Sequence, residues 1–359
     1  MTETLTVRAA DAETAARSSE EMDGVLTCAQ IRTVTHDVKS FVFRRPGGAA
    51  LRFAPGQYLA FTVDLGGKSV ERCYTISSSP ALQGLLSITV KRVPGGPVSN
   101  WLHDRLGVGD EVRATGPFGE FSNVYHPARK YLFLSAGSGI TPLMSMTRAL
   151  HESTHPADVV FVHSARTPDD IIFRSELEAL AERAGMSVTV VCEADSPGER
   201  WPGARGRLSP SFLHTIAPDL LDREVFTCGP VAYMEAVREA LDIWGVDPTR
   251  RHEESFHLCV PTSESRVVEN SAQRYRVELR RSGRVIDCDG ATTILDAALE
   301  AGVSLPSSCE AGVCGTCKST LLGGRVDMQH AGGIRPREIE RNTILPCCSR
   351  PLDDIVLDA

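Results

Sequence analysis

The stretch that decides the fold of the C-terminal part of the chain is Cys309-Glu310-Ala311-Gly312-Val313-Cys314-Gly315-Thr316-Cys317. Four residues separate its first two cysteines and two separate the last two. This spacing is typical of a [2Fe–2S] cluster site when a fourth cysteine follows downstream. Cluster sulfides accept hydrogen bonds from backbone N–H groups, so the loop must approach them closely. Gly312 and Gly315 have no Cβ and permit that approach.

Two neighbouring cysteines, Cys347 and Cys348, are the candidates for the fourth ligand. Adjacent residues on a strand point to opposite faces, so we expect only one of them to reach the cluster. The alternative interpretation is a structural zinc site. Zinc sites favour paired C-x2-C halves or added histidines, and a second such pair is missing from the sequence. The cysteine spacing therefore favours a [2Fe–2S] cluster over zinc.

The length and charge of the chain limit its organisation and its partners. Its 359 residues are enough for two or three domains. The net charge is −8, and residues 1–23 supply half of it, with six acids against Arg8 and Arg17. The rest of the chain is nearly balanced. We therefore expect neither nucleic acid nor an anionic membrane as a partner, since both require a basic surface.

The N-terminal segment and the cysteine content indicate the compartment. Residues 1–23 lack the basic start and apolar core of a secretory signal, and we expect a disordered tail there. No run of eighteen apolar residues occurs, so no membrane span is expected. Eleven cysteines without an export signal favour a reducing compartment and cofactor chemistry. We therefore expect a cytoplasmic protein.

Short alternating strands broken by Gly and Pro fill residues 24–125, which predicts a small antiparallel β-barrel. The expected strands are 27–34, 40–43, 58–63, 72–77, 85–91 and 111–115. Arg72 and Tyr74 occupy alternate positions on one strand, so their side chains face the same side and can bind one ligand together. An ordinary cross-strand surface pair has the same pattern. Gly96-Pro97-Val98-Ser99 opens an expected helix at 100–106, and its N–H groups and the Ser99 hydroxyl are suited to a pyrophosphate.

Strand-like and helical patterns alternate in residues 126–256, which predicts a doubly wound parallel sheet. The expected strands are 131–135, 158–163, 187–192 and 225–228, and the expected helices are 142–151, 174–184 and 231–244. Ligands bind such sheets at the carboxyl ends of the strands. Candidate binding residues are therefore expected where these strands end.

Three of these strand ends carry candidate dinucleotide-binding residues. Strand 131–135 runs into Gly137-Ser138-Gly139-Ile140-Thr141, a glycine turn at a helix start that stabilises a phosphate. Strand 225–228 ends in Cys228-Gly229-Pro230, where an inert buried thiol is the alternative for the cysteine. Arg166 follows strand 158–163 and can pair with a 2′-phosphate, which leaves NADPH open beside NADH.

The remaining part of the chain predicts a linker and a separate domain. Residues 257–272 are polar without an apolar period and are expected to form a flexible connector. Strands 275–281 and 284–288 form a hairpin around Ser282-Gly283, and a helix at 292–299 precedes the cysteine stretch.

In this order, the motifs resemble the ferredoxin–NADP reductase superfamily fused to a plant-type [2Fe–2S] ferredoxin. The resemblance covers nearly everything from residue 25 to 359. It is carried by R-x-Y-[ST] at 72–75, G-x-x-[ST] at 96–99, C-G-P-x-x-Y-M at 228–234 and the cysteine spacing. It implies a multidomain α/β and β protein with an FAD-binding β-barrel (24–125), a doubly wound NAD(P)-binding domain (126–256) and a β-grasp ferredoxin domain (273–359).

The resemblance also implies roles for individual residues. Arg72 would bind the flavin phosphate, Tyr74 would stack on the isoalloxazine and Thr75 would contact flavin N5. Cys228 would lie beside the reacting atoms of nicotinamide and flavin. The implied catalytic residues are Tyr74, Thr75, Cys228, Glu254 and Phe256.

Larger sets of residues are implied to hold the cofactors. Those for flavin are Arg72, Cys73, Tyr74, Thr75, Val90, Lys91, Gly96, Pro97, Val98 and Ser99. Those for the nicotinamide dinucleotide are Gly137, Ser138, Gly139, Thr141, Arg166, Cys228, Gly229 and Pro230. Leu345-x-Cys347 matches the fourth-ligand position, so the implied cluster ligands are Cys309, Cys314, Cys317 and Cys347.

Finer features at 326–330, 332–339 and 345–351 resemble the reductase components of Rieske oxygenases that demethylate glycine betaine, carnitine or related betaines. This implies that electrons pass from NADH through FAD and the cluster to a separate Rieske-type oxygenase. Alternative acceptors are a hybrid-cluster protein, a steroid hydroxylase or a ring-hydroxylating dioxygenase. A non-catalytic redox sensor or a zinc-stapled module is the alternative from another class, and FMN in place of FAD stays open.

Overall fold

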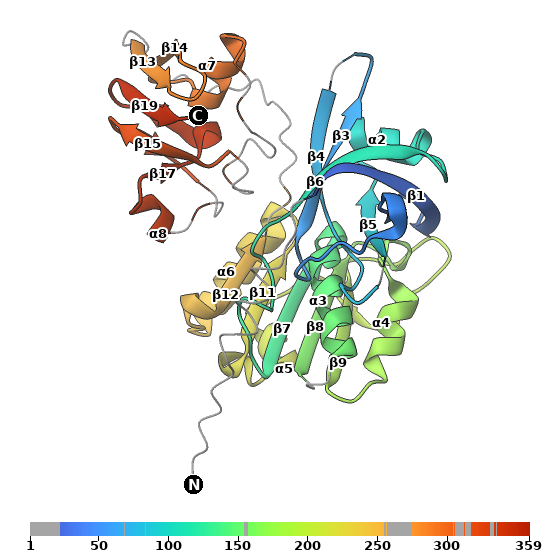
Figure 1. Cartoon of the computed structure of the whole chain (residues 1–359). Helices are drawn as coiled ribbons and strands as arrows, with labels where there is room; N and C mark the ends of the chain where they lie inside the picture. Colours follow the sequence, from blue (N-terminus) through green and yellow to red (C-terminus); the bar gives the residue numbers. More distant parts are fainter. Residues whose placement is uncertain are drawn as a thin grey trace. The chain divides into compact units, whose positions relative to one another are not determined.

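The computed structural model describes residues 22–359 except 68, 83, 154–156, 255, 257–273, 304, 306–311, 313–316, 331–333 and 335. The chain forms two compact units, Met1–Phe256 and His257–Ala359 (Figure 1). The expected linker at 257–272, residues 1–21 of the tail expected at 1–23, and Cys309 and Cys314 lie outside the described residues.

A six-stranded antiparallel sheet begins the first unit. Its strands are β1 (Met22–Thr35), β2 (Val38–Arg44), β3 (Tyr58–Asp64), β4 (Ser69–Thr75), β5 (Leu85–Lys91) and β6 (Glu111–Phe118), in the order β4-β3-β6-β1-β2-β5. An antiparallel bridge between Ile76 and Ile88 joins the two edges, so the sheet closes into the predicted barrel. Large fully buried side chains such as Phe41, Phe43 and Phe61 fill its interior.

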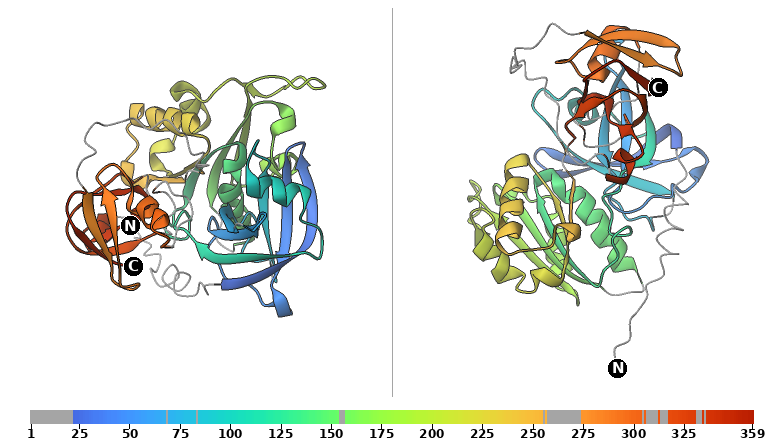
Figure 2. Two further views of the ribbon diagram at one scale, coloured as in Figure 1. Left: turned by 90° about the horizontal axis from the view of Figure 1, so that it is seen from above. Right: turned by 90° about the vertical axis from the view of Figure 1, so that its left-hand side faces the viewer.

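A six-stranded parallel sheet follows in the same unit. Its strands are β7 (Lys130–Ala136), β8 (Asp158–Ala165), β9 (Met186–Cys192), β10 (Ala204–Arg205), β11 (Glu224–Cys228) and β12 (Arg251–Glu254), in the order β10-β9-β8-β7-β11-β12. The helices are α3 (Ile140–Glu152), α4 (Arg174–Ala181), α5 (Pro210–Ile216) and α6 (Val231–Ile243). Figure 2 shows helices on both faces of this sheet. Successive residues of β7 therefore enter different cores: Phe133 packs with α3 and α4, and Leu132 and Leu134 pack with α5 and α6.

Some boundaries differ from those expected. The first barrel helix, α2 (Pro97–Asp104), begins at Pro97 and not at residue 100, because proline is well suited to the first helical position. β4 ends at Thr75 and not at residue 77. β1 begins at Met22, inside the segment expected as a tail. The short turns are η1 (Pro46–Gly48), η2 (Gly137–Gly139), η3 (Pro168–Asp170), η4 (Leu220–Asp222) and η5 (Pro248–Arg250).

The second unit has the expected β-grasp arrangement. Its elements are β13 (Arg274–Leu279), β14 (Arg284–Asp289), α7 (Ile294–Glu300), β15 (Ser319–Gly323), β16 (Val326–Met328), α8 (Pro336–Ile339), β17 (Thr343–Ile344), η6 (Pro346–Cys348), β18 (Ser349–Pro351) and β19 (Ile355–Asp358). The main sheet has the order β14-β13-β19-β15-β17, with β13 and β19 parallel. Ile294 and Leu295 of α7 are buried in the same core as Val277, Leu357 and Cys347.

Candidate functional site

The strand β4 presents the residues expected to hold flavin. Thr75 is buried, and within the described part of the chain its Oγ1 has no hydrogen-bond partner. The Tyr74 ring packs edge-on against Phe61, with ring centroids 5.9 Å apart. Burial raises the pKa of Tyr74 by more than the Arg72 guanidinium lowers it, so the phenol stays protonated. A buried hydroxyl without a partner fits a cofactor that forms hydrogen bonds.

The turn before α2 is held together by its own side chains. Ser99 Oγ donates to the Gly96 carbonyl at 3.2 Å and accepts from the Val93 N–H at 3.2 Å. A methyl group on Gly96 would lie 2.7 Å from Ser99 Oγ, so this position requires glycine. The Ser99 hydroxyl is used to close the turn. We therefore expect a phosphate to be bound by the N–H groups of the first turn of α2 and not by this hydroxyl.

The neighbouring strand β5 contributes two other expected flavin residues. Val90 is buried, and its carbonyl lies 2.9 Å from Nε2 of His103. The Lys91 ammonium forms an ion pair with Asp37 at 3.3 Å. Cys73, between Arg72 and Tyr74, is partly buried. These residues occupy the expected strands, and their contact with flavin stays a prediction.

The glycine turn after β7 packs directly on the end of β11. A methyl group on Gly139 would lie 2.2 Å from the Cys228 carbonyl oxygen, so only glycine fits between α3 and β11. Thr141 Oγ1 donates to the Ser138 carbonyl at 3.0 Å and tightens the turn. A methyl on Gly229 would lie 2.8 Å from the Tyr233 ring. The start of α3 thus lies at the carboxyl edge of the sheet, where a dinucleotide phosphate is expected to bind.

Cys228 and Glu254 lie opposite each other at the ends of β11 and β12. Burial, and then the Glu254 charge, raise the pKa of Cys228 well above its usual range. Burial raises the pKa of Glu254 to about 8, and its Oε2 has no hydrogen-bond partner in the described residues. Both groups are therefore mainly protonated at neutral pH.

The barrel approaches this pair through Tyr58 and Gly119. Tyr58 lies opposite Thr75 in the β3–β4 ladder. A methyl group on Gly119 would lie 3.0 Å from the Tyr58 ring and 3.9 Å from Glu254 Oε1. Gly119, in the turn that follows β6, thus lies near both the Tyr58 ring and the Glu254 carboxyl group. Phe256, also expected here, has a side chain that is 41% exposed.

Residues of α3 that the sequence did not indicate tie the barrel to the parallel sheet. Ser145 Oγ donates to the Ser78 carbonyl at 2.8 Å, and Arg148 Nη1 donates to the Ser77 carbonyl. The Arg148 guanidinium also pairs with Glu176 and lies 4.7 Å from the centroid of the Phe173 ring. No sequence pattern distinguishes such an arginine from one on an exposed helix face.

The second unit brings two of the expected cluster ligands together. Cys317 and Cys347 are buried, with Sγ atoms 3.2 Å apart. The Gly312 N–H donates to Cys347 Sγ at 3.3 Å, as expected for a backbone group that stabilises a ligand thiolate. Cys348 Sγ instead lies 3.5 Å from the Leu345 carbonyl. The paired sulfurs and the N–H donor fit an iron–sulfur cluster, and Cys347 fits better than Cys348.

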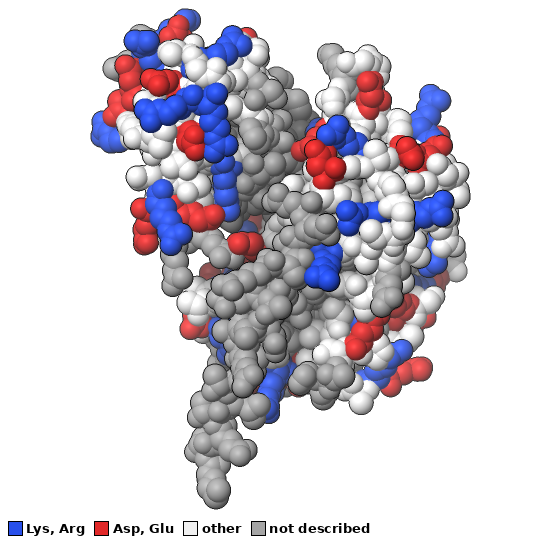
Figure 3. Space-filling view, in the orientation of Figure 1, with Lys and Arg blue, Asp and Glu red and all other residues white. Residues whose placement is uncertain are grey.

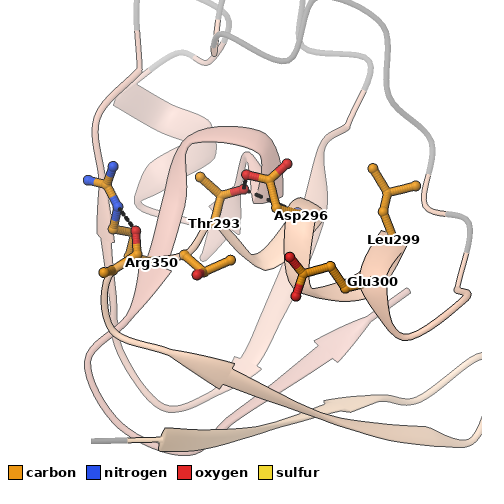
Figure 4. A pocket seen from close by; sticks show the side chains of 7 residues that line it. Thr293, Asp296, Leu299, Glu300 and Arg350 are labelled. Atoms are coloured by element: carbon orange, nitrogen blue, oxygen red, sulfur yellow. Dashed lines mark hydrogen bonds between the residues drawn. The ribbon is translucent and has the colours of Figure 1, made fainter. Parts of the chain in front are cut away.

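A hollow on the second unit contains none of the expected site residues (Figure 4). Thr293 caps α7 there by accepting from the Asp296 N–H at 3.2 Å, and Arg350 donates to the Ala291 carbonyl at 2.9 Å. These contacts explain the local structure without a ligand.

Charged side chains of both signs are interspersed on the face seen in Figure 3. No helix among the residues that the structure describes is both long and apolar enough to traverse a membrane.

Three family models match the chain in the order predicted from the motifs. They are an oxidoreductase FAD-binding domain at 26–123, an oxidoreductase NAD-binding domain at 133–239 and a 2Fe-2S iron-sulfur cluster binding domain at 277–352. They confirm the expected cofactors, which are FAD, NADH and a [2Fe–2S] cluster. They also confirm that this is an oxidoreductase.

Curated relatives match almost the whole chain. The glycine betaine monooxygenase reductase subunit of Pseudomonas aeruginosa is 42% identical over 346 residues, covering 93% of this chain and 94% of the relative. The stachydrine N-demethylase reductase subunit of Rhizobium meliloti is 41% identical over 338 residues, covering 93% of this chain and 96% of the relative. The crystal structure of phthalate dioxygenase reductase is 27% identical with a TM-score of 0.62, covering 94% of this chain and 98% of that one. This match confirms the predicted fold class.

Proposed function

Because this chain belongs to the family of oxygenase reductase subunits with FAD-binding, NAD-binding and [2Fe–2S] domains, we propose that it serves a Rieske-type oxygenase that demethylates a betaine or another quaternary ammonium compound. The observation that carries the proposal is the 42% identity, over 93% of the chain, to a glycine betaine monooxygenase reductase subunit. The stachydrine N-demethylase reductase, at 41%, supports the same substrate class. The cytoplasm is the compartment that suits eleven cysteines and a [2Fe–2S] site.

The bound cofactors would supply the redox chemistry, in which one hydride is accepted from NADH and its two electrons are passed on singly. The protein's part is to bind and orient. Thr75 offers its unpartnered hydroxyl to the flavin. Gly139 lets the start of α3 lie against Cys228, so the residues of this turn and of the β11 end would together hold a bound dinucleotide.

Cys228 and Glu254 keep their protons beside the reacting groups. The neutral thiol packs there without acting as a nucleophile, because its pKa is raised by burial. Glu254 holds a proton on a carboxyl group whose Oε2 has no partner among the described residues, since burial raises its pKa to about 8. A neutral carboxyl group can donate a hydrogen bond that an ionised one cannot.

Reconstitution with oxygenases tests the proposed partner. The purified protein is combined with NADH and, in parallel, with a betaine-demethylating Rieske oxygenase, a steroid-hydroxylating one and a ring-hydroxylating one. We expect substrate-dependent NADH oxidation and formaldehyde release with the first. Turnover only with another oxygenase would reject the betaine assignment while keeping the family assignment.

Anaerobic titration tests the electron route independently of the partner. Addition of NADH is expected to bleach the flavin absorbance and then the cluster absorbance of the same preparation. Iron analysis that found zinc in place of iron would support a zinc-stapled module instead.

A further inference from the structure

Two hydroxyl groups at the carboxyl edge of the parallel sheet are buried without a hydrogen-bond partner among the described residues. They belong to Ser164, near the end of β8, and to Tyr233, whose N–H donates to the Pro230 carbonyl at 2.9 Å in the first turn of α6. Both residues are partly exposed, whereas their oxygen atoms are withdrawn from water. A buried polar atom without a partner is unfavourable, and a ligand or an ordered water bound there removes this penalty.

The fold places these two hydroxyls on the same face of the sheet. Because residues alternate along a strand, Ser164 shares with Val162 the face that packs with α6, and Tyr233 packs in the same core. A helical side chain leans toward the N-terminus of its helix, so the Tyr233 ring extends back over the strand ends. A methyl group on Gly229 would lie 2.8 Å from this ring and 3.1 Å from Ala136 Cβ. The ring therefore lies beside the ends of β11 and β7.

The chemistry of the pair suits an acceptor. Burial raises the pKa of Tyr233, and the neighbouring Ser164 hydroxyl lowers it in part, so the phenol stays protonated at neutral pH. Each hydroxyl has one proton to donate, whereas a phosphate oxygen can only accept. Two neighbouring O–H donors without an acceptor therefore fit a phosphate oxygen.

The pair lies next to the turn where a phosphate is expected. Ala136 lies opposite Ser164 in the β7–β8 ladder, and the glycine turn Gly137–Gly139 follows it directly. β7 lies between β8 and β11, with α3 packed on one face of the sheet and α6 on the other. Ligands of doubly wound sheets bind in the crevice where the strand order reverses in this way. The hydroxyl pair thus borders this crevice from the α6 side, and the start of α3 borders it from the other.

Two other polar groups at the end of β8 are accounted for differently. His163 lies on the opposite face of the sheet, is fully buried, and has its Nδ1 2.9 Å from Ser135 Oγ. Burial lowers its pKa to about 3, so it is a neutral core histidine although its Nε2 has no partner among the described residues. Arg166 is ion-paired with Asp170 at 2.5 Å. Neither group therefore competes with the hydroxyl pair for the expected phosphate.

We propose that the hydroxyls of Tyr233 and Ser164 donate hydrogen bonds to the diphosphate of the bound nicotinamide dinucleotide. The N–H groups at the start of α3 hold the diphosphate from one side of the crevice, and this pair holds it from the α6 side. Because α6 begins directly after Cys228-Gly229-Pro230, the contact also ties the nucleotide to the strand end that carries Cys228. The inference rests on the nucleotide site expected at this edge and is independent of which oxygenase is served.

Binding of two nucleotide fragments to the full-length holoprotein tests this inference. ADP-ribose carries the diphosphate and adenosine lacks it, and both affinities are measured by isothermal titration calorimetry. Tyr233→Phe keeps the ring and removes only the hydroxyl. We expect it to weaken ADP-ribose binding about fivefold to twentyfold and to leave adenosine binding unchanged within twofold. Ser164→Ala should weaken ADP-ribose binding about threefold to tenfold.

Tyr131→Phe is the matched control, because the Tyr131 hydroxyl already has a partner in the free protein. It accepts from the Ala128 N–H at 2.7 Å, near the opposite end of β7. Its loss should lower the midpoint temperature of flavin release, followed by fluorescence, without changing the affinity for ADP-ribose. Tyr233→Phe should instead keep or raise this midpoint, since it removes an unsatisfied buried atom, and the rise in midpoint on adding ADP-ribose should shrink.

Unchanged affinity for ADP-ribose in Tyr233→Phe would overturn the proposal while leaving the nucleotide site and the oxygenase assignment intact. A lowered midpoint with unchanged affinity would also overturn it, because the pair would then hold a structural water. An equal loss of adenosine affinity would place the pair on the nucleoside and reject the diphosphate assignment. A wild-type protein that bound no ADP-ribose would overturn the expected nucleotide site together with this inference.

Discussion

At the scale of single residues, the candidate active site contains buried polar atoms that lack a hydrogen-bond partner among the described residues, as do Asn123 and His163 elsewhere. Arg223 is also buried, but it is ion-paired with Asp158 and Asp219. Glu254 has a buried oxygen without a hydrogen-bond partner among the described residues, and Cys228 lies opposite it. Because groups with strongly shifted pKa values gather at functional sites, this contrast supports the proposed roles.

Glu254 should make the stability of the protein fall as pH rises. Its pKa is about 8 in the folded chain against an ordinary value near 4.5, so between these values the unfolded chain loses a proton that the folded chain keeps. The free energy of unfolding should drop by up to about 1.4 kcal/mol per pH unit across this window. In Glu254→Gln this contribution should be absent, as measured by urea unfolding at several pH values.

Glu239→Gln is the control for this measurement, because Glu239 is exposed on α6. Its unfolding free energy should follow that of the wild type at every pH. Parallel curves for wild type and Glu254→Gln would show that Glu254 does not hold its proton.

The adjacent cysteines offer a matched pair of variants. Cys347 Sγ lies 3.2 Å from Cys317 Sγ and accepts from the Gly312 N–H, whereas Cys348 contacts the Leu345 carbonyl. We expect Cys347→Ser to lose bound iron and visible absorbance, and Cys348→Ser to keep both. The opposite pattern in iron analysis would assign the fourth ligand to Cys348.

Covalent ligands were the residues most readily predicted from the sequence. A [2Fe–2S] cluster needs four cysteine ligands at a characteristic spacing, so Cys309, Cys314 and Cys317 can be recognised from the sequence alone. The choice of Cys347, first made by resemblance, gains support from its contacts and stays a prediction. The protonation of Glu254 could not be predicted, because desolvation depends on neighbours such as Cys228 and Gly119 that are remote in sequence.

At the scale of elements, periodic patterns predicted most strands and helices but not their ends. α6 and β5 were predicted well because apolar residues recur regularly along them. The short α5 and β12 were missed, since neither is long enough to show a period. The contacts of α3 with the barrel were also beyond prediction, because a helical period marks a buried face without naming its partner.

Removal of the Arg148 side chain should weaken the attachment of the barrel to the parallel sheet. Arg148 donates to the Ser77 carbonyl and pairs with Glu176, and its side chain is 21% exposed. Arg148→Ala should lower the free energy of unfolding by about 2 kcal/mol, because charged hydrogen bonds are lost. It should also slow flavin reduction by NADH in stopped-flow measurements.

Arg32→Ala provides the comparison, since the exposed Arg32 side chain donates a hydrogen bond to Gln30 on its own strand. Its stability and flavin reduction should equal those of the wild type. Normal flavin reduction in Arg148→Ala would mean that this contact serves stability alone.

At the scale of the whole molecule, the sequence predicts the order of the domains along the chain but not their arrangement in space. Each cofactor needs its own motif, and the three motifs follow one another along the chain in the order FAD, nicotinamide dinucleotide and [2Fe–2S] cluster. The expected boundaries at 24–125, 126–256 and 273–359 stay predictions. Sequence alone cannot locate these domain boundaries to the residue, because a linker is recognised by the absence of contacts with the domains that it joins.

The two units should be separable by function. In Cys317→Ser, loss of a cluster ligand from the second unit should leave the first unit intact. NADH should still bleach the flavin, while reduction of cytochrome c by single electrons should fall at least about tenfold. Equal losses of flavin reduction and of cytochrome c reduction would show that the first unit needs the cluster for its activity. This result would contradict the expectation that the two units function independently.

Helix α3 has the nucleotide turn at one end and its contacts with the barrel loop Ser77–Ser79 along its length. That loop directly follows β4, which carries Arg72 to Thr75. The residues expected to hold flavin and those expected to hold the nucleotide are thus both attached to α3, so any tilt of this helix would shift both sets together. We therefore expect the alignment of hydride donor and acceptor to depend on the rigidity of thirteen helical residues.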